Sequence, residues 1–207
     1  MALVSMAALV AGARSGRLVS FPTDTVPALA AIASRTDEIF ALKQRPKDKP
    51  LILMAAKLDE LLRFVDTEHS ALPLWRKVAK QYLPGALTLV LPANFLGRQL
   101  NPDFDTIGVR IPEHPIALAL LQQTGALLTT SANPSGQPPM RKMLEISNYF
   151  PEVLVLGDRL ENGLGKEENL EIVTGSGSPS TVAEWTDTGW QIRRQGSVKL
   201  SEIIGSH

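Results

Sequence analysis

Basic side chains are concentrated in one short segment of this chain. Residues 43–49 read Lys-Gln-Arg-Pro-Lys-Asp-Lys, which places four cations and one carboxylate within seven residues. Pro46 and Pro50 fix their own φ angles and disfavour helix in the residue before them, so the cations lie on a stiff, extended backbone. A stiff cationic loop suits the binding of a polyanion such as a triphosphate. A solvated, lysine-rich connection is the simpler explanation of this segment taken alone.

Small polar residues recur at the expected strand ends and in loops. Glycines and short hydroxyl side chains let backbone N–H groups and hydroxyls come close to a phosphate or a carboxylate. In open α/β sheets such loops gather at one edge, where ligands bind. Each segment is also an ordinary turn sequence, because Asp, Asn, Ser, Pro and Gly favour turns for local reasons. The segments are residues 23–25, 84–88, 129–133 and 178–181, and residues 131–136 also form a turn sequence.

Arg110 is a charged residue inside the apolar segment 107–111. An arginine that is half-buried in a strand needs an anionic partner, which is either a protein carboxylate or a substrate carboxylate bound by both arms of the guanidinium. An edge-strand arginine that points to water is the alternative. Asp24 also has two interpretations, since its carboxylate suits either Mg²⁺ or a loop backbone.

The composition describes an ordinary soluble globular protein, and we expect one domain over residues 1–207. Lys plus Arg equals Asp plus Glu at 21 each, so any basic surface is local. The chain has no cysteine, which excludes disulfides, a thiol nucleophile and a cysteine zinc site, and its three histidines leave little for a histidine-bound metal. The sequence has neither a Walker A loop nor a Gly-x-Gly-x-x-Gly dinucleotide motif.

The first twelve residues are apolar and alanine-rich. They lack the basic start of a signal peptide and are too short to span a bilayer. Leu3, Met6, Leu9 and Val10 fit one face of a helix that residues 14–16 end. We therefore expect a cytoplasmic protein that does not enter the membrane.

Short apolar segments separated by turns and helices predict a mixed α/β sheet rather than a strictly parallel one. Thr36 is placed to cap one of the helices. Residues 160–180 have little apolar content and are expected to be the most flexible part. The expected strands are 18–21, 28–33, 51–55, 87–91, 107–111, 126–130, 153–156 and a hairpin of 181–185 and 190–194; the expected helices are 36–44, 58–65, 71–83, 116–123 and 142–149.

Taken in order, the polar segments resemble the YrdC/TsaC family of threonylcarbamoyl-AMP synthases. The similarity runs from Val4 to about Val198. Each motif alone is weak, whereas seven in the right order and spacing are specific. They are Phe21-Pro22-Thr23-Asp24-Thr25-Val26, Lys43-x-Arg45-Pro46-x-x-Lys49-Pro50-Leu51, Pro84-Gly85-Ala86-Leu87-Thr88, Gly108-Val109-Arg110-Ile111-Pro112, Ser131-Ala132-Asn133-x-Ser135-Gly136, Ser180-Thr181-Val182 and Arg194-Gln195-Gly196.

The resemblance implies a twisted α/β sheet around a concave basic cavity. It implies an enzyme that joins L-threonine, bicarbonate and ATP, with Mg²⁺, into threonylcarbamoyl-AMP and pyrophosphate. Partner proteins for tRNA modification would then transfer the threonylcarbamoyl unit to tRNA. Such phosphoryl chemistry depends on positioning and charge neutralisation, so the shortage of His and Cys fits it.

By position, the resemblance divides the site residues between the two substrates. Lys43, Arg45 and Lys49 fall where cations face the triphosphate, and we assign the catalytic role to them. The ATP contacts are Arg45, Lys49, Thr106, Ser131, Asn133 and Arg194, and the threonine contacts are Thr25, Arg110, Thr129 and Ser180. No metal-binding side chain is assigned.

Several positions depart from the family pattern. Pro27 stands where a tyrosine is usual, and it lacks a backbone donor. Met54 replaces a threonine-contacting histidine of several relatives, Pro139 a common serine and Pro179 a frequent glutamate. These changes leave open an alternative, namely a non-catalytic relative that binds a nucleotide, tRNA or double-stranded RNA through the same basic surface.

Overall fold

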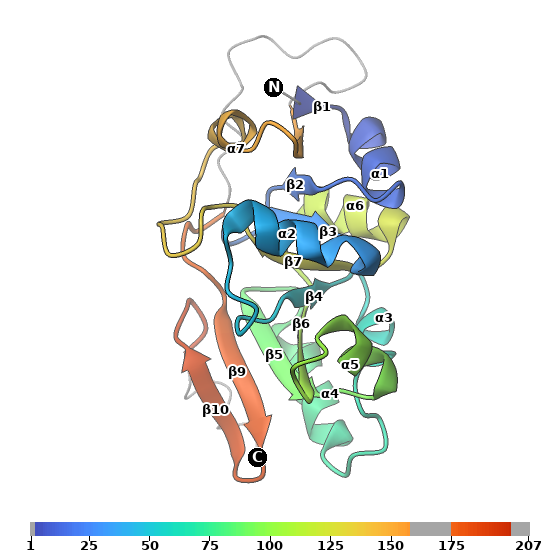
Figure 1. The fold of residues 1–207 in the computed structure, drawn as a ribbon. Helices are drawn as coiled ribbons and strands as arrows, with labels where there is room; N and C mark the ends of the chain where they lie inside the picture. Colours follow the sequence, from blue (N-terminus) through green and yellow to red (C-terminus); the bar gives the residue numbers. More distant parts are fainter. Residues whose placement is uncertain (1–2, 158–174, 200–207) are drawn as a thin grey trace.

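A ten-stranded mixed sheet forms the centre of the computed structural model, which describes residues 3–157 and 175–199. Its strand order is β1-β8-β2-β3-β7-β4-β6-β5-β9-β10. Figure 1 shows the sheet running from β1 near the N-terminus to the β9–β10 hairpin at the other end of the molecule. Strands distant in the sequence are therefore neighbours.

The strands are short, and their bounds are close to those expected. They are β1 (Leu3–Val4), β2 (Val19–Phe21), β3 (Ala28–Ala31), β4 (Ile52–Met54), β5 (Leu87–Pro92), β6 (Thr106–Arg110), β7 (Leu127–Ser131), β8 (Leu154–Leu156), β9 (Thr181–Thr186) and β10 (Gly189–Arg194). The helices are α1 (Met6–Arg14), α2 (Thr36–Lys43), α3 (Leu58–Leu62), α4 (Leu72–Tyr82), α5 (Phe95–Leu100), α6 (Pro115–Thr124) and α7 (Met143–Tyr149), and a short 3₁₀ turn covers Ala33–Arg35.

The sheet combines parallel and antiparallel pairs, as expected from the sequence. The pairs β1–β8, β8–β2, β4–β6 and β5–β9 are parallel. The pairs β2–β3, β3–β7, β7–β4, β6–β5 and β9–β10 are antiparallel. Parallel neighbours need crossover connections, and here each connection contains at least one further strand as well as helices.

Helices cover the sheet and complete a single hydrophobic core. In Figure 1, α2 lies in front of β3 and β7, and α1 lies beside α6, with which it is in contact. On α4, Trp75, Val78 and Ala79 are buried, which is the one-sided pattern of an amphipathic helix. Pro115 occupies the first turn of α6, where its missing N–H costs no hydrogen bond.

Two expectations near the helix starts were wrong. The N-terminal helix does not include Leu3, because Leu3 and Val4 pair with β8 and Ser5 caps α1 by accepting a hydrogen bond from the Ala8 N–H at 3.3 Å. Thr36 does not cap α2 either. It is the first helical residue, and its hydroxyl donates to the Ala33 carbonyl at 3.2 Å.

Helix α5 was not expected from the sequence. Its six residues are too short for a clear periodicity, and its start depends on a side-chain cap. Asn94 Oδ1 accepts from the Gly97 N–H at 3.0 Å, and Asn94 Nδ2 donates to the carbonyls of Arg63 and Val65. Long-range contacts thus fix this helix.

The expected hairpin around residues 186–189 is confirmed, and an aromatic cluster holds it. The rings of Trp185 and Trp190 lie 5.2 Å apart and those of Trp75 and Trp185 lie 6.1 Å apart, which anchors the hairpin on α4. Residues 160–174 of the segment expected to be flexible lie outside the described residues. Within the described part of the chain, no helix is long and apolar enough to cross a membrane.

Candidate active site

One cavity of about 580 Å³, counted to its open mouth, collects side chains from both ends of the sequence. Three arginines line it, and none of its lining residues is acidic. The lining residues are Thr25, Val26, Pro27, Ala28, Arg45, Pro50, Ile52, Met54, Arg110, Thr129, Thr130, Ser131, Pro179, Ser180 and Arg194.

Most of the residues singled out in the sequence meet in this cavity. Arg45 and Arg194, which are far apart in the sequence, both line this cavity. Thr25, Arg110, Thr129, Ser131 and Ser180 line it too. Lys43, Lys49, Thr106 and Asn133 do not. The substrate contacts expected of all these residues stay predictions.

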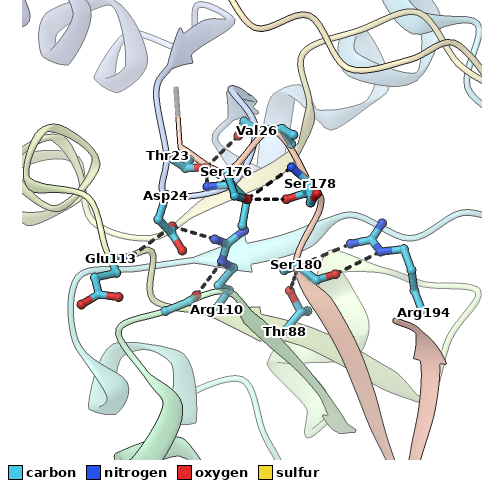
Figure 2. Close-up of polar contacts among 12 residues, drawn as sticks. Thr23, Asp24, Val26, Thr88, Arg110, Glu113, Ser176, Ser178, Ser180 and Arg194 are labelled. Carbon is cyan, nitrogen blue, oxygen red and sulfur yellow. Dashed lines mark hydrogen bonds and ion pairs between the residues drawn. The ribbon is translucent and has the colours of Figure 1, made fainter. Parts of the chain in front are cut away.

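Arg110 is the most completely bonded of the arginines. It ends β6, an interior strand, and is 3% exposed, which excludes the edge-strand alternative. Its Nη2 lies 2.7 Å from Asp24 Oδ1, its Nη1 donates to Thr25 Oγ1 at 2.9 Å, and its Nε donates to the Gly85 carbonyl at 3.0 Å (Figure 2). Burial lowers the pKa of Arg110, and the charge of Asp24 opposes that shift.

Asp24 therefore binds protein groups rather than standing free for a metal. Besides Arg110, its Oδ1 accepts from the Glu113 N–H at 3.1 Å. Among the described residues, no group of three or more acidic, His or Cys side chains is placed to hold a metal ion. None of the side chains that line the cavity is a carboxylate, which is the protein group that most often binds Mg²⁺.

A turn that starts at Gly175 closes over the loop that carries Asp24 and Thr25. The Ser176 N–H donates to the Asp24 carbonyl at 3.0 Å, and the Gly177 N–H donates to the Thr25 carbonyl at 2.9 Å. A Cβ on Gly175 would lie 2.0 Å from the Asp24 carbonyl carbon, so only glycine fits this approach. The turn leads directly into Pro179 and Ser180 of the cavity wall.

Arg45 is held by its own loop. Its Nε donates to the Lys49 carbonyl at 3.0 Å and its Nη2 donates to the Pro50 carbonyl at 3.1 Å. Burial lowers the pKa of Arg45, and repulsion by Arg194 lowers it further, whereas Asp48 raises it. The guanidinium stays charged, since arginine is effectively always protonated. Uncompensated positive charge thus remains at this end of the cavity.

Arg194 lies at the end of β10 and reaches across to β9. Its Nε donates to the Ser180 carbonyl at 3.1 Å and its Nη2 donates to Ser180 Oγ at 3.3 Å (Figure 2). Ser180 Oγ is also 2.9 Å from Thr88 Oγ1 on β5. Burial lowers the pKa of Arg194, and the charge of Arg110 lowers it further.

Lys43 lies behind the cavity wall rather than in it. Its ammonium donates to Thr130 Oγ1 at 3.3 Å and to the Ser131 carbonyl, while the Lys43 carbonyl accepts from the Ser135 N–H at 3.3 Å. Burial lowers the pKa of Lys43 to about 7, and Arg45 adds to the shift. Lys43 thereby ties the C-terminus of α2 to the loop after β7.

The other three residues outside the lining have different surroundings. The side chain of Asn133 is buried and donates to the carbonyls of Pro134 and Gln137. Thr106 begins β6 at the end away from Arg110. Lys49 is exposed, next to the loop turn that Arg45 closes.

Two threonines of the cavity lining, Thr25 and Thr129, are at most 1% exposed, and each hydroxyl keeps a lone pair that no described group fills. Thr129 Oγ1 donates to the Ile52 carbonyl at 2.9 Å, so its oxygen is left as an acceptor. Thr23 Oγ1 donates to the Val26 carbonyl at 2.7 Å, so in its 3.1 Å contact with Thr25 the Thr25 hydroxyl is the donor. Thr25 Oγ1 then offers a lone pair, and both threonines suit an N–H donor such as an amine.

Sequence reasoning missed some residues that support the site. Thr88 was noted only as part of a polar segment, although its hydroxyl contacts Ser180. The side-chain amide of Asn101 lies 3.4 Å from both the N and the O of Leu51, next to the basic loop of residues 43–49. No local pattern marks Asn101, because its partner is far away in the sequence. Three of the departures, Pro27, Met54 and Pro179, line the cavity.

A sequence model of the Sua5/YciO/YrdC family, described as telomere recombination, matches residues 12–196. The chain belongs to this family. The threonylcarbamoyl-AMP synthase of Mannheimia succiniciproducens is 34% identical over 175 residues, which cover 82% of this chain and 95% of the relative. The enzyme of the same name from Bacillus subtilis is 36% identical over 164 residues, which cover 76% of this chain.

A solved structure supports the same fold. The crystal structure of P. abyssi Sua5 complexed with L-threonine has a TM-score of 0.82 and 31% identity, and the match covers 97% of this chain. The chain spans about half the length of the longer relatives, with 46% of the Bacillus protein and 56% of the P. abyssi chain covered.

Proposed function

We propose that the chain is an L-threonylcarbamoyladenylate synthase, which forms threonylcarbamoyl-AMP and pyrophosphate from L-threonine, bicarbonate and ATP for tRNA modification. The convergence of Arg45, Arg110 and Arg194 on one cavity without an acidic lining residue carries this proposal. The names of the relatives and the bound L-threonine of the P. abyssi protein support it.

The two ends of the cavity suit the two substrates. Asp24 neutralises Arg110, so this end binds a single carboxylate through the remaining N–H groups of the guanidinium. Thr25 and Thr129 offer lone pairs to the amine of the amino acid. Arg45 and Arg194 repel each other, and a triphosphate bound between them would relieve this repulsion.

The reaction then needs positioning more than acid–base catalysis. Bicarbonate loses hydroxide to give CO₂, and the threonine amine adds to CO₂ with loss of a proton, so that a carbamate and one water form. A carbamate oxygen then attacks the α-phosphorus of ATP, and pyrophosphate leaves. The arginines hold the anions in line and offset the charge of the departing pyrophosphate. Mg²⁺ would come with the triphosphate, and no step is assigned to a protein-bound metal.

Exchange of labelled pyrophosphate into ATP tests the proposal. Exchange should depend on both L-threonine and bicarbonate, and Arg45→Ala or Lys49→Ala should lower it by about tenfold or more, the value of one charged hydrogen bond. Arg17→Ala is the matched control, because Arg17 is exposed and, among the described residues, donates to the Glu152 carbonyl alone, at 3.4 Å. Pyrophosphate exchange that does not depend on threonine would refute the synthase proposal. The absence of exchange at every Mg²⁺ concentration would also refute it.

The non-catalytic alternative keeps one specific observation in its favour. Pro27, Met54 and Pro179 all line the cavity, so the departures from the family pattern lie where substrates would bind. A binder of double-stranded RNA or tRNA should lose affinity steeply between about 50 and 200 mM salt, because phosphate contacts release counterions. A flat salt response, or binding unaffected by loss of the basic loop, would count against this alternative.

A further inference from the structure

Thr88 forms a buried hydroxyl pair with Ser180 that the proposed function does not explain. Thr88 is on β5 and is 0% exposed, and Ser180 just before β9 is 2% exposed. Their hydroxyl oxygens are 2.9 Å apart, and Ser180 Oγ also accepts from Arg194 Nη2 at 3.3 Å (Figure 2). Only Ser180 and Arg194 of this trio line the cavity.

Hydrogen-bond accounting assigns the direction of this pair. A buried hydroxyl must donate its proton, and within the described part of the chain the only partner of the Thr88 hydroxyl is Ser180 Oγ. If Ser180 donated to Thr88, the Thr88 proton would have no acceptor, because Thr88 does not line the cavity, whereas Ser180 does and a ligand there can accept its proton. Thr88 is therefore the donor and Ser180 the acceptor.

The consequence for Ser180 is that both of its lone pairs are occupied. A serine hydroxyl has one proton and two acceptor positions, and here Thr88 fills one and Arg194 fills the other. The Ser180 proton is then left for the cavity, and Ser180 is unable to accept from an amine. Its bond to Arg194 also makes the hydroxyl a stronger donor.

We propose that Thr88 is a positioning residue that turns Ser180 into an obligate donor to an anionic oxygen of the amino-acid substrate. Ser180 thus binds the carboxylate together with Arg110, whereas Thr25 and Thr129 are left for the amine. This inference rests on the proposed function, and it adds the orientation of the amino acid in the cavity.

Thr88→Val tests the proposal, because it removes the hydroxyl and keeps the shape of the side chain. We expect the KM for L-threonine in pyrophosphate exchange to rise about three- to tenfold, the effect of one hydrogen bond. The KM for ATP should change by less than about twofold, since the Arg194 bond to the Ser180 carbonyl is kept. Thr88→Ser restores the donor and should restore the KM.

A double-mutant cycle separates positioning from a general structural effect. In the Ser180→Ala background there is no hydroxyl to orient, so Thr88→Val should have little further effect on the KM for threonine. Thr186→Val is the matched control, because the Thr186 hydroxyl donates to the Gly189 carbonyl at 2.9 Å at the far end of the same hairpin. It should leave both KM values unchanged.

The possible results separate failure of this inference from failure of the proposed function. An unchanged KM for threonine in Thr88→Val, equal increases in both KM values, or additive effects of the two substitutions would overturn the inference and leave the synthase proposal standing. If the wild-type protein neither binds nor uses threonine, by calorimetry and exchange, the proposed function and this inference fail together.

Discussion

Single side chains in this protein are held by partners that lie far away in the sequence. Arg110 depends on Asp24, which is 86 residues away, and Lys43 depends on the Ser131 carbonyl 88 residues away. The sequence marks Arg110 as a charge within an apolar strand and Lys43 as part of a basic segment. It did not identify the partners, because no local pattern records which loops the sheet brings together.

Loss of the Asp24 carboxylate should destabilise the fold. Asp24→Ala leaves the Arg110 charge buried and unpaired, so we expect the free energy of unfolding to fall by about 3–5 kcal/mol. Glu184→Ala is the control, since it breaks the exposed ion pair with Arg193, and it should cost about 0–1 kcal/mol. Urea unfolding measures both. Equal losses in the two variants would contradict the account of this pair.

Lys43 should make stability depend on pH. Its pKa is about 7 in the folded chain and 10.5 when it is exposed, so between these values the unfolded chain binds more protons. The free energy of unfolding should therefore rise with pH, by at most about 2 kcal/mol between pH 7 and about pH 9. Lys43→Met should lack this increment in paired urea titrations. An identical pH dependence in the two proteins would rule out a shifted Lys43.

The basic loop of residues 43–49 is fixed at its C-terminal end by strand β4 and by Asn101. The backbone of β4 pairs with β6 from Ile52 onward, and the side-chain amide of Asn101 contacts the backbone N and O of Leu51 just before it. Asn101 thus extends the ladder by one residue at the end of the loop that carries Arg45. Buried backbone groups need such partners.

Asn101→Ala should loosen this loop. We expect a loss of about 1–2 kcal/mol in unfolding free energy and weaker ATP binding. Threonine affinity should be retained, because Asp24, Thr25 and Gly85 hold Arg110 and the loop of Arg45 does not. Asn148→Ala, at an exposed position of α7, is the control and should change neither. If Asn101→Ala weakens threonine and ATP binding alike, the loop is not the element affected.

Some of the helices and strands could be predicted from the sequence, and others could not. Strands with continuous apolar residues, such as β5, and the amphipathic helix α4 follow from their patterns. The two-residue strand β1 and the six-residue helix α5 do not, because tertiary pairing with β8 and the Asn94 cap determine them. The cavity itself was predictable only through the order of the motifs, since Arg45 and Arg194 meet by sheet topology.

At the scale of the whole molecule, strand β10 connects the cavity to the tryptophan cluster. All three tryptophans, Trp75, Trp185 and Trp190, lie in one cluster, and β10 carries both Trp190 and Arg194. ATP binding to Arg194 should therefore change the tryptophan emission. Arg194→Ala should abolish the change, and Arg17→Ala should keep it. A response that survives in Arg194→Ala would show that the hairpin does not report on the nucleotide.

We propose that three arginines divide one cavity, with Arg45 and Arg194 binding the triphosphate and Arg110 binding the amino-acid carboxylate. Calorimetric titration with ATP, with and without L-threonine, tests it most directly. Arg45→Ala and Arg194→Ala should each weaken ATP binding about tenfold or more, while Arg110→Ala should remove only the gain in ATP affinity that threonine provides. ATP affinity that is unchanged in both Arg45→Ala and Arg194→Ala would contradict the claim.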